Sequence, residues 1–164
     1  KLSGAVLSSE DTKKLNVIMY SLRDYERIAD LAQNTVIKMQ NIYATKEKIT
    51  NEAVGEMAKM LEVCYLAVKD TINMFLQRDL KFGASVNEKE EYIDKLERTA
   101  IKNHMNRTRE GKCVGSAAVI YVDIISDIER IGDHAVNIVE HYTYKDLVLT
   151  PEEEDLDLSK FIIE

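Results

Sequence analysis

The sequence SDIERIGDHAVNI at residues 126–138 has a counterpart earlier in the chain, DYERIADLAQN at residues 24–34. Residues 24–34 align with residues 127–137 without a gap, at a constant spacing of 103 residues. Acidic residues recur at the same places, so that Glu26 and Asp30 match Glu129 and Asp133. An internal repeat at this distance indicates a duplicated helical unit.

Four long amphipathic helices are predicted around these two stretches. The single proline is Pro151, so no obligate helix breaker interrupts the chain before it. Capping boxes that begin at Ser8 and Ser85 predict two of the helix starts. The expected helices cover about residues 10–42, 51–81, 85–109 and 116–144.

The connections between these helices are short, which makes neighbouring helices run antiparallel. We therefore predict an all-α fold, an up-down antiparallel four-helix bundle. Residues 1–145 are expected to form the helical domain, and residues 146–164 an acidic C-terminal tail.

Composition excludes several functional classes. A net charge of −7 argues against a nucleic-acid groove, and it suggests that any bound phosphate needs a cation to mediate the contact. The longest unbroken apolar run, residues 117–122, is far shorter than the roughly 20 residues that cross a bilayer. The N-terminal residues lack the apolar core of a secretory leader, and the two cysteines form no Cys-x-x-Cys pattern. We expect a cytoplasmic protein.

The repeated Glu-x-x-x-Asp pairs are the main candidate site. Positions i and i+4 share one face of a helix, about 6 Å apart along its axis. Glu26 falls inside an apolar stripe between Leu22 and Ala29, and Glu129 has the matching place. Carboxylates aimed at a core are costly unless an arginine, a lysine or a metal ion neutralises them. We predict that both pairs point at one shared cation site, whose oxygen ligands suit iron, manganese, magnesium, calcium or zinc.

Weaker support comes from other acids and from histidines. Glu90, Asp94 and Glu97 follow i, i+4, i+7 spacing in the third predicted helix, and Glu97 lies near its apolar stripe. His104 and His134 are candidate nitrogen ligands.

Two other interpretations compete with a metal-binding module. Arg27 or Arg130 can reach across to the opposite helix and neutralise the acids, which would make the protein a structural helical adaptor. A carboxylate-bridged metal oxidase needs Glu-x-x-His on two helices, but isoleucine stands three residues before each of the three histidines. No Ser-His-Asp or Cys-His arrangement emerges either, so we expect the protein not to be an enzyme.

Residues 126–138 closely resemble the signature of the PhoU family of bacterial phosphate-uptake regulators, and residues 24–34 resemble its partner copy. The segment EYIDKLE at residues 91–97 is similar to the helix that precedes this signature. The resemblance covers roughly residues 1–145. It implies a duplicated three-helix unit whose first two helices are absent, similar to the C-terminal PhoU-like region of sodium-dependent phosphate transporters.

The resemblance also implies a function. It suggests regulation of phosphate transport by docking on a transporter membrane domain or a signalling protein, at the inner face of the membrane. It implies multinuclear iron or zinc held by Glu26, Asp30, Glu129 and Asp133, although Leu31 stands where the second copy has a histidine. Loss of two helices would expose apolar surface on the first helix, so we expect a homodimer or an exchange of helices between chains.

Overall fold

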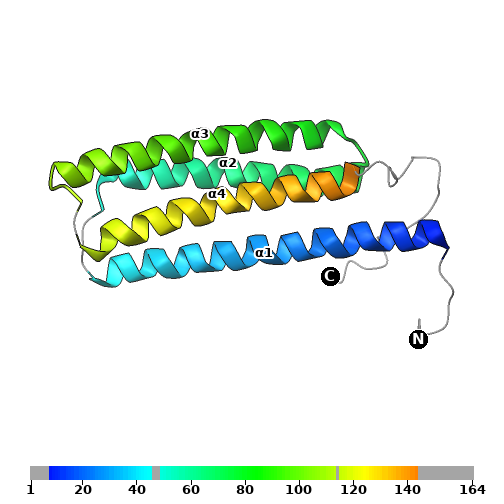
Figure 1. Cartoon of the computed structure of the whole chain (residues 1–164), viewed down its shortest axis with the longest axis horizontal. Coiled ribbons are helices and arrows are strands. Elements are labelled where there is room, and N and C mark those ends of the chain that lie inside the picture. The colour runs from blue at the N-terminus through cyan, green and yellow to red at the C-terminus, as the bar shows by residue number, and fades with distance from the viewer. Residues whose placement is uncertain (1–7, 46–48, 114, 144–164) are drawn as a thin grey trace.

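The computed structural model describes residues 8–45, 49–113 and 115–143, and these form four α-helices (Figure 1). The helices are α1 (Ser9–Thr45), α2 (Asn51–Gln77), α3 (Lys81–Arg109) and α4 (Ser116–Thr143). The predicted all-α fold and the number of helices are therefore confirmed. The acidic tail expected at residues 146–164 lies outside the described residues.

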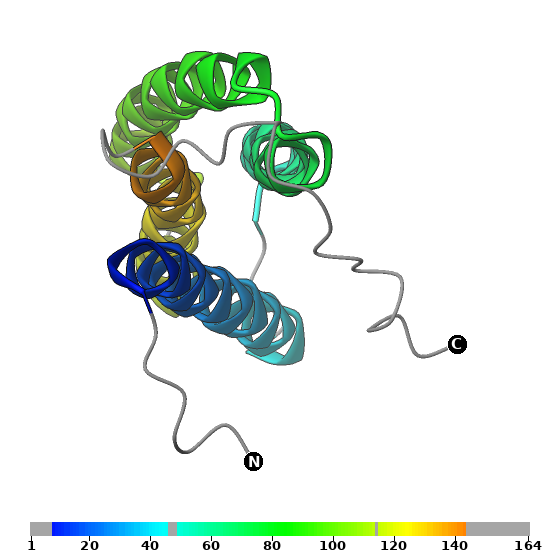
Figure 2. The same cartoon turned by 90° about the vertical axis from the view of Figure 1, so that its right-hand side faces the viewer.

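Successive helices run in opposite directions, and α4 occupies the centre of the arrangement (Figure 1). The helices α2, α3 and α4 form a three-helix unit in which each contacts the other two. Among the described residues α1 packs along α4, on the side of α4 away from α3 (Figure 2). Its Tyr25 hydroxyl also donates a hydrogen bond to the Thr71 hydroxyl of α2 at 2.9 Å. The two copies of the repeat, in α1 and α4, thus lie antiparallel against each other.

Two helix starts follow directly from capping residues. The Ser8 Oγ accepts a hydrogen bond from the Asp11 backbone N–H at 3.0 Å, and the Asp11 carboxylate accepts one from the Ser8 N–H at 3.4 Å. This reciprocal pair confirms the predicted capping box. At the start of α2, the Thr50 hydroxyl accepts a hydrogen bond from the Ala53 N–H at 3.3 Å.

The predicted start of the third helix at Ser85 is wrong. The helix α3 already begins at Lys81, and the Ser85 hydroxyl donates a hydrogen bond to Asp70 at 2.8 Å instead. Gly83, just before the predicted start, is a packing residue of the helix, because a Cβ there would lie 2.9 Å from a methyl group of Val139. The preceding helix ends earlier than predicted, at Gln77.

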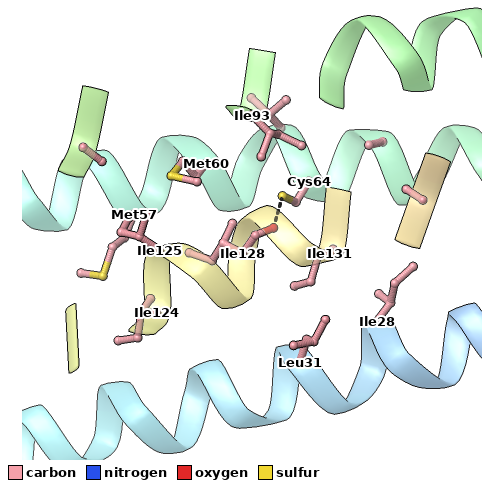
Figure 3. Packing of buried hydrophobic residues seen from close by; sticks show 14 of the residues in the cluster. Ile28, Leu31, Met57, Met60, Cys64, Ile93, Ile124, Ile125, Ile128 and Ile131 are labelled. Carbon is pink, nitrogen blue, oxygen red and sulfur yellow. Dashed lines mark hydrogen bonds between the residues drawn. The ribbon is translucent and has the colours of Figure 1, made fainter. Parts of the chain in front are cut away.

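The core gathers mainly around α4. Ile124, Ile125 and Ile128 are fully buried, and Figure 3 shows them between side chains of α2, α3 and α1. The Cys64 thiol lies in this core and donates a hydrogen bond to the Ile128 carbonyl at 3.2 Å. Burial and the charge of Glu129 raise the pKa of Cys64 to about 12, so this thiol stays protonated at neutral pH.

The apolar stripe predicted to bury α1 faces outward instead. Leu22 is 56% exposed, whereas its counterpart Ile125 in the second copy is completely buried. The reason is that α2 and α3 cover this face of α4, whereas no described helix covers the equivalent face of α1. The buried side of α1 is a different line of residues: Val17, Ser21, Asp24, Ile28, Leu31, Thr35 and Ile42.

Candidate metal centre

The acids of α4 meet acids of α3. Glu129 and Asp133 lie on the side of α4 that faces α3, and three acids of α3 act on them electrostatically. The two helices come close here because Gly132 has no side chain: a Cβ there would lie 3.1 Å from the Cδ1 atom of Ile93. We call the resulting group the acidic cluster; it consists of Glu90, Asp94, Glu97, Glu129 and Asp133.

Negative charge accumulates in the acidic cluster. Burial, followed by the charges of its four neighbours in the cluster, raises the pKa of Glu129 to about 7. Burial likewise raises the pKa values of Glu90, Glu97 and Asp133, and nearby carboxylates add to each shift. Arg98 offsets part of this charge through an exposed ion pair with Asp94 at 3.3 Å. A divalent cation would relieve the remaining repulsion between these carboxylates. Without a cation, a proton bound to one of the carboxylates relieves it.

The first Glu-x-x-x-Asp pair, Glu26 and Asp30, does not belong to the acidic cluster. Glu26 is exposed and the Asp30 side chain is 53% exposed, with its Oδ2 atom 3.7 Å from Arg27 Nη1. The structure does not bring the two pairs together: Glu129 and Asp133 face the acids of α3, whereas Glu26 is exposed and Asp30 lies beside Arg130 and His134. No described helix contacts α1 on the side equivalent to the one where Glu129 meets α3. One cation site shared by both pairs stays a prediction, as does a metal role for Glu26 and Asp30 themselves.

The structure places His134 in the seam between α1 and α4, where its Nδ1 atom lies 2.8 Å from Asp24 Oδ1. His141 shares the same carboxylate, with Nε2 at 2.9 Å from Asp24 Oδ2. His104 is further away still, stacked on the Tyr121 ring with 4.9 Å between ring centroids. No histidine thus belongs to the acidic cluster among the residues that the structure describes.

Sequence reasoning missed the role of two buried aspartates. Asp24 pairs with His141, and its counterpart Asp127 pairs with Lys38 at 2.6 Å. Lys38 and His141 are themselves 103 positions apart, the spacing of the repeat. The two ion pairs are therefore equivalent contacts about an approximate two-fold axis between α1 and α4. The sequence signal that could have revealed these contacts is the aspartate at the same place in both copies of the repeat.

A second missed group joins α2, α3 and α4. The Glu56 carboxylate accepts hydrogen bonds from Arg107 at 2.8 and 3.0 Å, from Asn103 at 2.8 Å and from the Tyr121 hydroxyl. Burial raises the pKa of Glu56, but these hydrogen bonds outweigh it and leave the pKa lowered. The bidentate contact with Arg107 identifies this group as a structural tie between helices.

The acidic cluster has the donor atoms of a metal site, but they do not converge in their present rotamers. Among the described residues, no three histidine, cysteine or carboxylate side chains stand close enough together to hold an ion in their present rotamers. The donor set nevertheless fits a hard cation, because it consists of carboxylate oxygens on two packed helices. Glutamate side chains have several accessible rotamers, through which Glu90, Glu97 and Glu129 can move toward an ion.

Comparisons with known proteins agree with the resemblance in sequence. The PhoU domain family matches residues 57–141. The phosphate-specific transport system accessory protein PhoU homolog 1 of Thermotoga maritima is 31% identical over 135 residues, which are 80% of this chain and 57% of that protein. A PhoU homolog of Rhizobium meliloti is 26% identical over 133 residues, 79% of this chain and 55% of that protein. The chain thus spans little more than half the length of these relatives. No solved structure matches it.

Proposed function

Because this chain belongs to the PhoU family, we propose that it is a non-enzymatic regulatory module of phosphate transport. Its action would combine metal binding at the acidic cluster with docking on a transporter or a signalling protein. The names of its relatives, accessory proteins of a phosphate-specific transport system, support this proposal.

The single observation that carries the metal part is the convergence of α3 and α4 acids on Glu129. A carboxyl group whose pKa is raised to about 7 by burial and four like-charged neighbours binds a cation in exchange for its proton. We propose iron or zinc, in a multinuclear arrangement, or else another divalent cation. Glu129 and Asp133 would supply ligands from α4, and Glu90, Asp94 and Glu97 would complete the site from α3.

The docking part is supported by the uncovered face of α1. Leu15, Met19, Leu22 and Val36 are between 45% and 58% exposed and lie along this one face. Single exposed apolar residues are ordinary, but several of them on one face of one helix, here interrupted by Glu26 and Gln33, mark an interaction surface. We propose that a pair of helices from the partner covers it, as α2 and α3 cover the equivalent face of α4.

Two further parts of the proposal concern assembly and location. A second copy of this chain would compete for the same stripe, so we propose a homo-oligomer when no partner is present. We place the protein in the cytoplasm, at the inner face of the membrane as part of a transporter. None of the four described helices has an apolar stretch long enough to cross a bilayer.

Metal content tests the metal part directly. The chain would be purified without immobilised metal, analysed for bound elements, and titrated with iron and zinc by calorimetry. We expect stoichiometric metal, lost in the double variant Glu129→Gln with Asp133→Asn. Glu140→Gln is the matched control, because Glu140 is exposed on the same helix and outside the acidic cluster. Equal metal content in the double variant and the control would contradict the assignment.

A further inference from the structure

A pocket of about 210 Å³ opens at the seam between α1 and α4. Its wall includes Arg27, Asp30, Gln33 and Asn34 from α1, and Arg130 and His134 from α4. None of these residues belongs to the acidic cluster, although the charges of Arg130 and His134 act on Asp133 at its edge.

The two arginines reach this pocket because of the internal symmetry. Arg27 and Arg130 occupy equivalent positions in the two copies of the repeat. The paired contacts of Asp24 and Asp127 show that α1 and α4 are related by an approximate two-fold axis. Such an axis places equivalent side chains on the same side of the seam, one from each helix. Two guanidinium groups therefore line a single pocket in a chain whose net charge is −7.

The positive charge of this pocket is offset only in part, by the Asp30 carboxylate in its wall and by Asp133 near Arg130. Arg27 Nη1 lies 3.7 Å from Asp30 Oδ2, which is too long for a hydrogen bond. No hydrogen bond or ion pair joins the Arg130 side chain to any other part of the chain that the structure describes. His134 uses Nδ1 for Asp24, which leaves Nε2 as its remaining polar atom. The pocket thus offers two planar guanidinium groups, with the side-chain amides of Gln33 and Asn34 beside them.

We propose that this pocket binds inorganic phosphate, with Arg27 and Arg130 as its two cationic donors. Guanidinium groups match tetrahedral oxyanions because their forked N–H groups bind two oxygens at once. The amides of Gln33 and Asn34 supply further N–H donors at the rim. The net charge of −7 suggested that a cation would have to mediate phosphate binding, but here the two arginines supply the positive charge and no metal ion is required. The inference therefore goes beyond the metal site proposed above and is tested separately from it.

Asp30 gives the pocket a preference among oxyanions. Phosphate keeps at least one P–OH hydrogen at neutral pH, and this hydrogen can donate to the Asp30 carboxylate. Sulfate has no such hydrogen, so its oxygens meet the carboxylate as two like charges. A site that accepts a hydrogen bond disfavours a ligand that cannot donate one, although by less than at a fully buried site, because the Asp30 side chain is 53% exposed. The pocket is therefore assigned to phosphate rather than to sulfate.

The test is phosphate binding to the full chain after removal of metal ions with a chelator, measured by calorimetry and by equilibrium dialysis with radiolabelled phosphate. We expect one phosphate per chain. Arg27→Gln and Arg130→Gln should each weaken it roughly tenfold or more, the usual loss for a charged hydrogen-bond donor. Arg23→Gln is the matched control, since Arg23 is an exposed arginine of α1 outside the pocket. Circular dichroism would verify that every variant keeps its helices.

A second arm tests the role of Asp30. Sulfate should bind more weakly than phosphate to the native chain, and Asp30→Asn should bring the two affinities closer because an amide donates to either anion. Equal binding of both anions by the native chain would overturn the assignment to phosphate. Binding that requires added metal, or that both arginine variants leave unchanged, would overturn the pocket itself. Retained metal with no phosphate binding would refute this inference and leave the metal site intact.

Discussion

Glu129 and Glu26 hold the same position in the two copies of one repeat, but their surroundings are opposite. Glu129 lies among four other carboxylates between α3 and α4, whereas Glu26 is exposed on the outer face of α1. Arginine follows the glutamate and aspartate stands four residues later in both copies, but Ala29 stands where Gly132 lets α3 approach. The larger cause is that α2 and α3 cover this face of one copy only. A repeat thus specifies a helix and its contact with the other copy, while flanking helices determine what its carboxylates meet.

The largest expected effect is on the free energy of unfolding, at the apolar residues that stand four positions before these two glutamates. Ile125→Ala should lower the free energy of unfolding by about 3 kcal/mol, because Ile125 is fully buried and the substitution leaves a cavity. Leu22→Ala at the equivalent position should change the stability of the monomer, measured at concentrations too low for a second copy to bind, by less than about 0.5 kcal/mol, because Leu22 is 56% exposed there. Urea denaturation would measure both. Similar losses would mean that α1 is covered in solution, as in a homodimer, and light scattering would then detect the second copy.

The next effect concerns contacts that both copies share. Asp24→Ala and Asp127→Ala should each destabilise the chain by about 2 kcal/mol, because each leaves a partly buried cationic or hydrogen-bonding partner unpaired. The two losses should be similar, as expected for positions related by the two-fold axis. Thermal and chemical unfolding of the single variants would measure them. Asp123→Ala is the control, since Asp123 is an exposed aspartate of α4. A loss of stability at only one of the two positions would contradict the two-fold relation between α1 and α4.

The smallest effect is the pH dependence that Glu129 causes in the metal-free chain. Its pKa is about 7 in the folded state and 4.5 when unperturbed, so the folded chain holds this proton more tightly than the unfolded chain does. Its stabilising effect is complete below about pH 4.5 and is lost as the pH rises through 7. After allowance for solvent screening, the loss should be about 1 kcal/mol.

Glu129→Gln should remove this pH dependence, and Glu26→Gln should not. The measurement is the difference in unfolding free energy between each variant and the native chain from pH 5 to pH 8. Saturating metal should reverse the trend in the native chain, because the cation replaces the proton. A flat difference for Glu129→Gln would show that the acidic cluster is more solvated than its geometry indicates.

Much of this fold was predictable from local signals. The four helices follow from hydrophobic periodicity, and the first start follows from the capping box at Ser8. The spacing of Glu90, Asp94 and Glu97 made them weaker candidates for the site, and the structure places these acids of α3 beside Glu129. These features depend on residues within a few turns of each other, which is the range over which sequence patterns carry information.

The remaining features depend on contacts between distant segments. α1 carries apolar residues on two faces, and periodicity cannot reveal which of them meets a neighbour. Ser85 looks like a helix cap until Gly83, two residues earlier, is seen packed against Val139. Glu56 and Arg107 are 51 residues apart and carry no local pattern that links them. Each error came from assigning a side chain to a face before its tertiary neighbours were known.

The central position of α4 has a mechanical consequence. Glu129 and Asp133 point toward α3, while Arg130 and His134, each the next residue in the chain, line the pocket beside α1. Because α4 is one continuous helix, any displacement of it moves both sets of side chains together. One element thus carries two chemically unlike surfaces, without any loop or hinge between them.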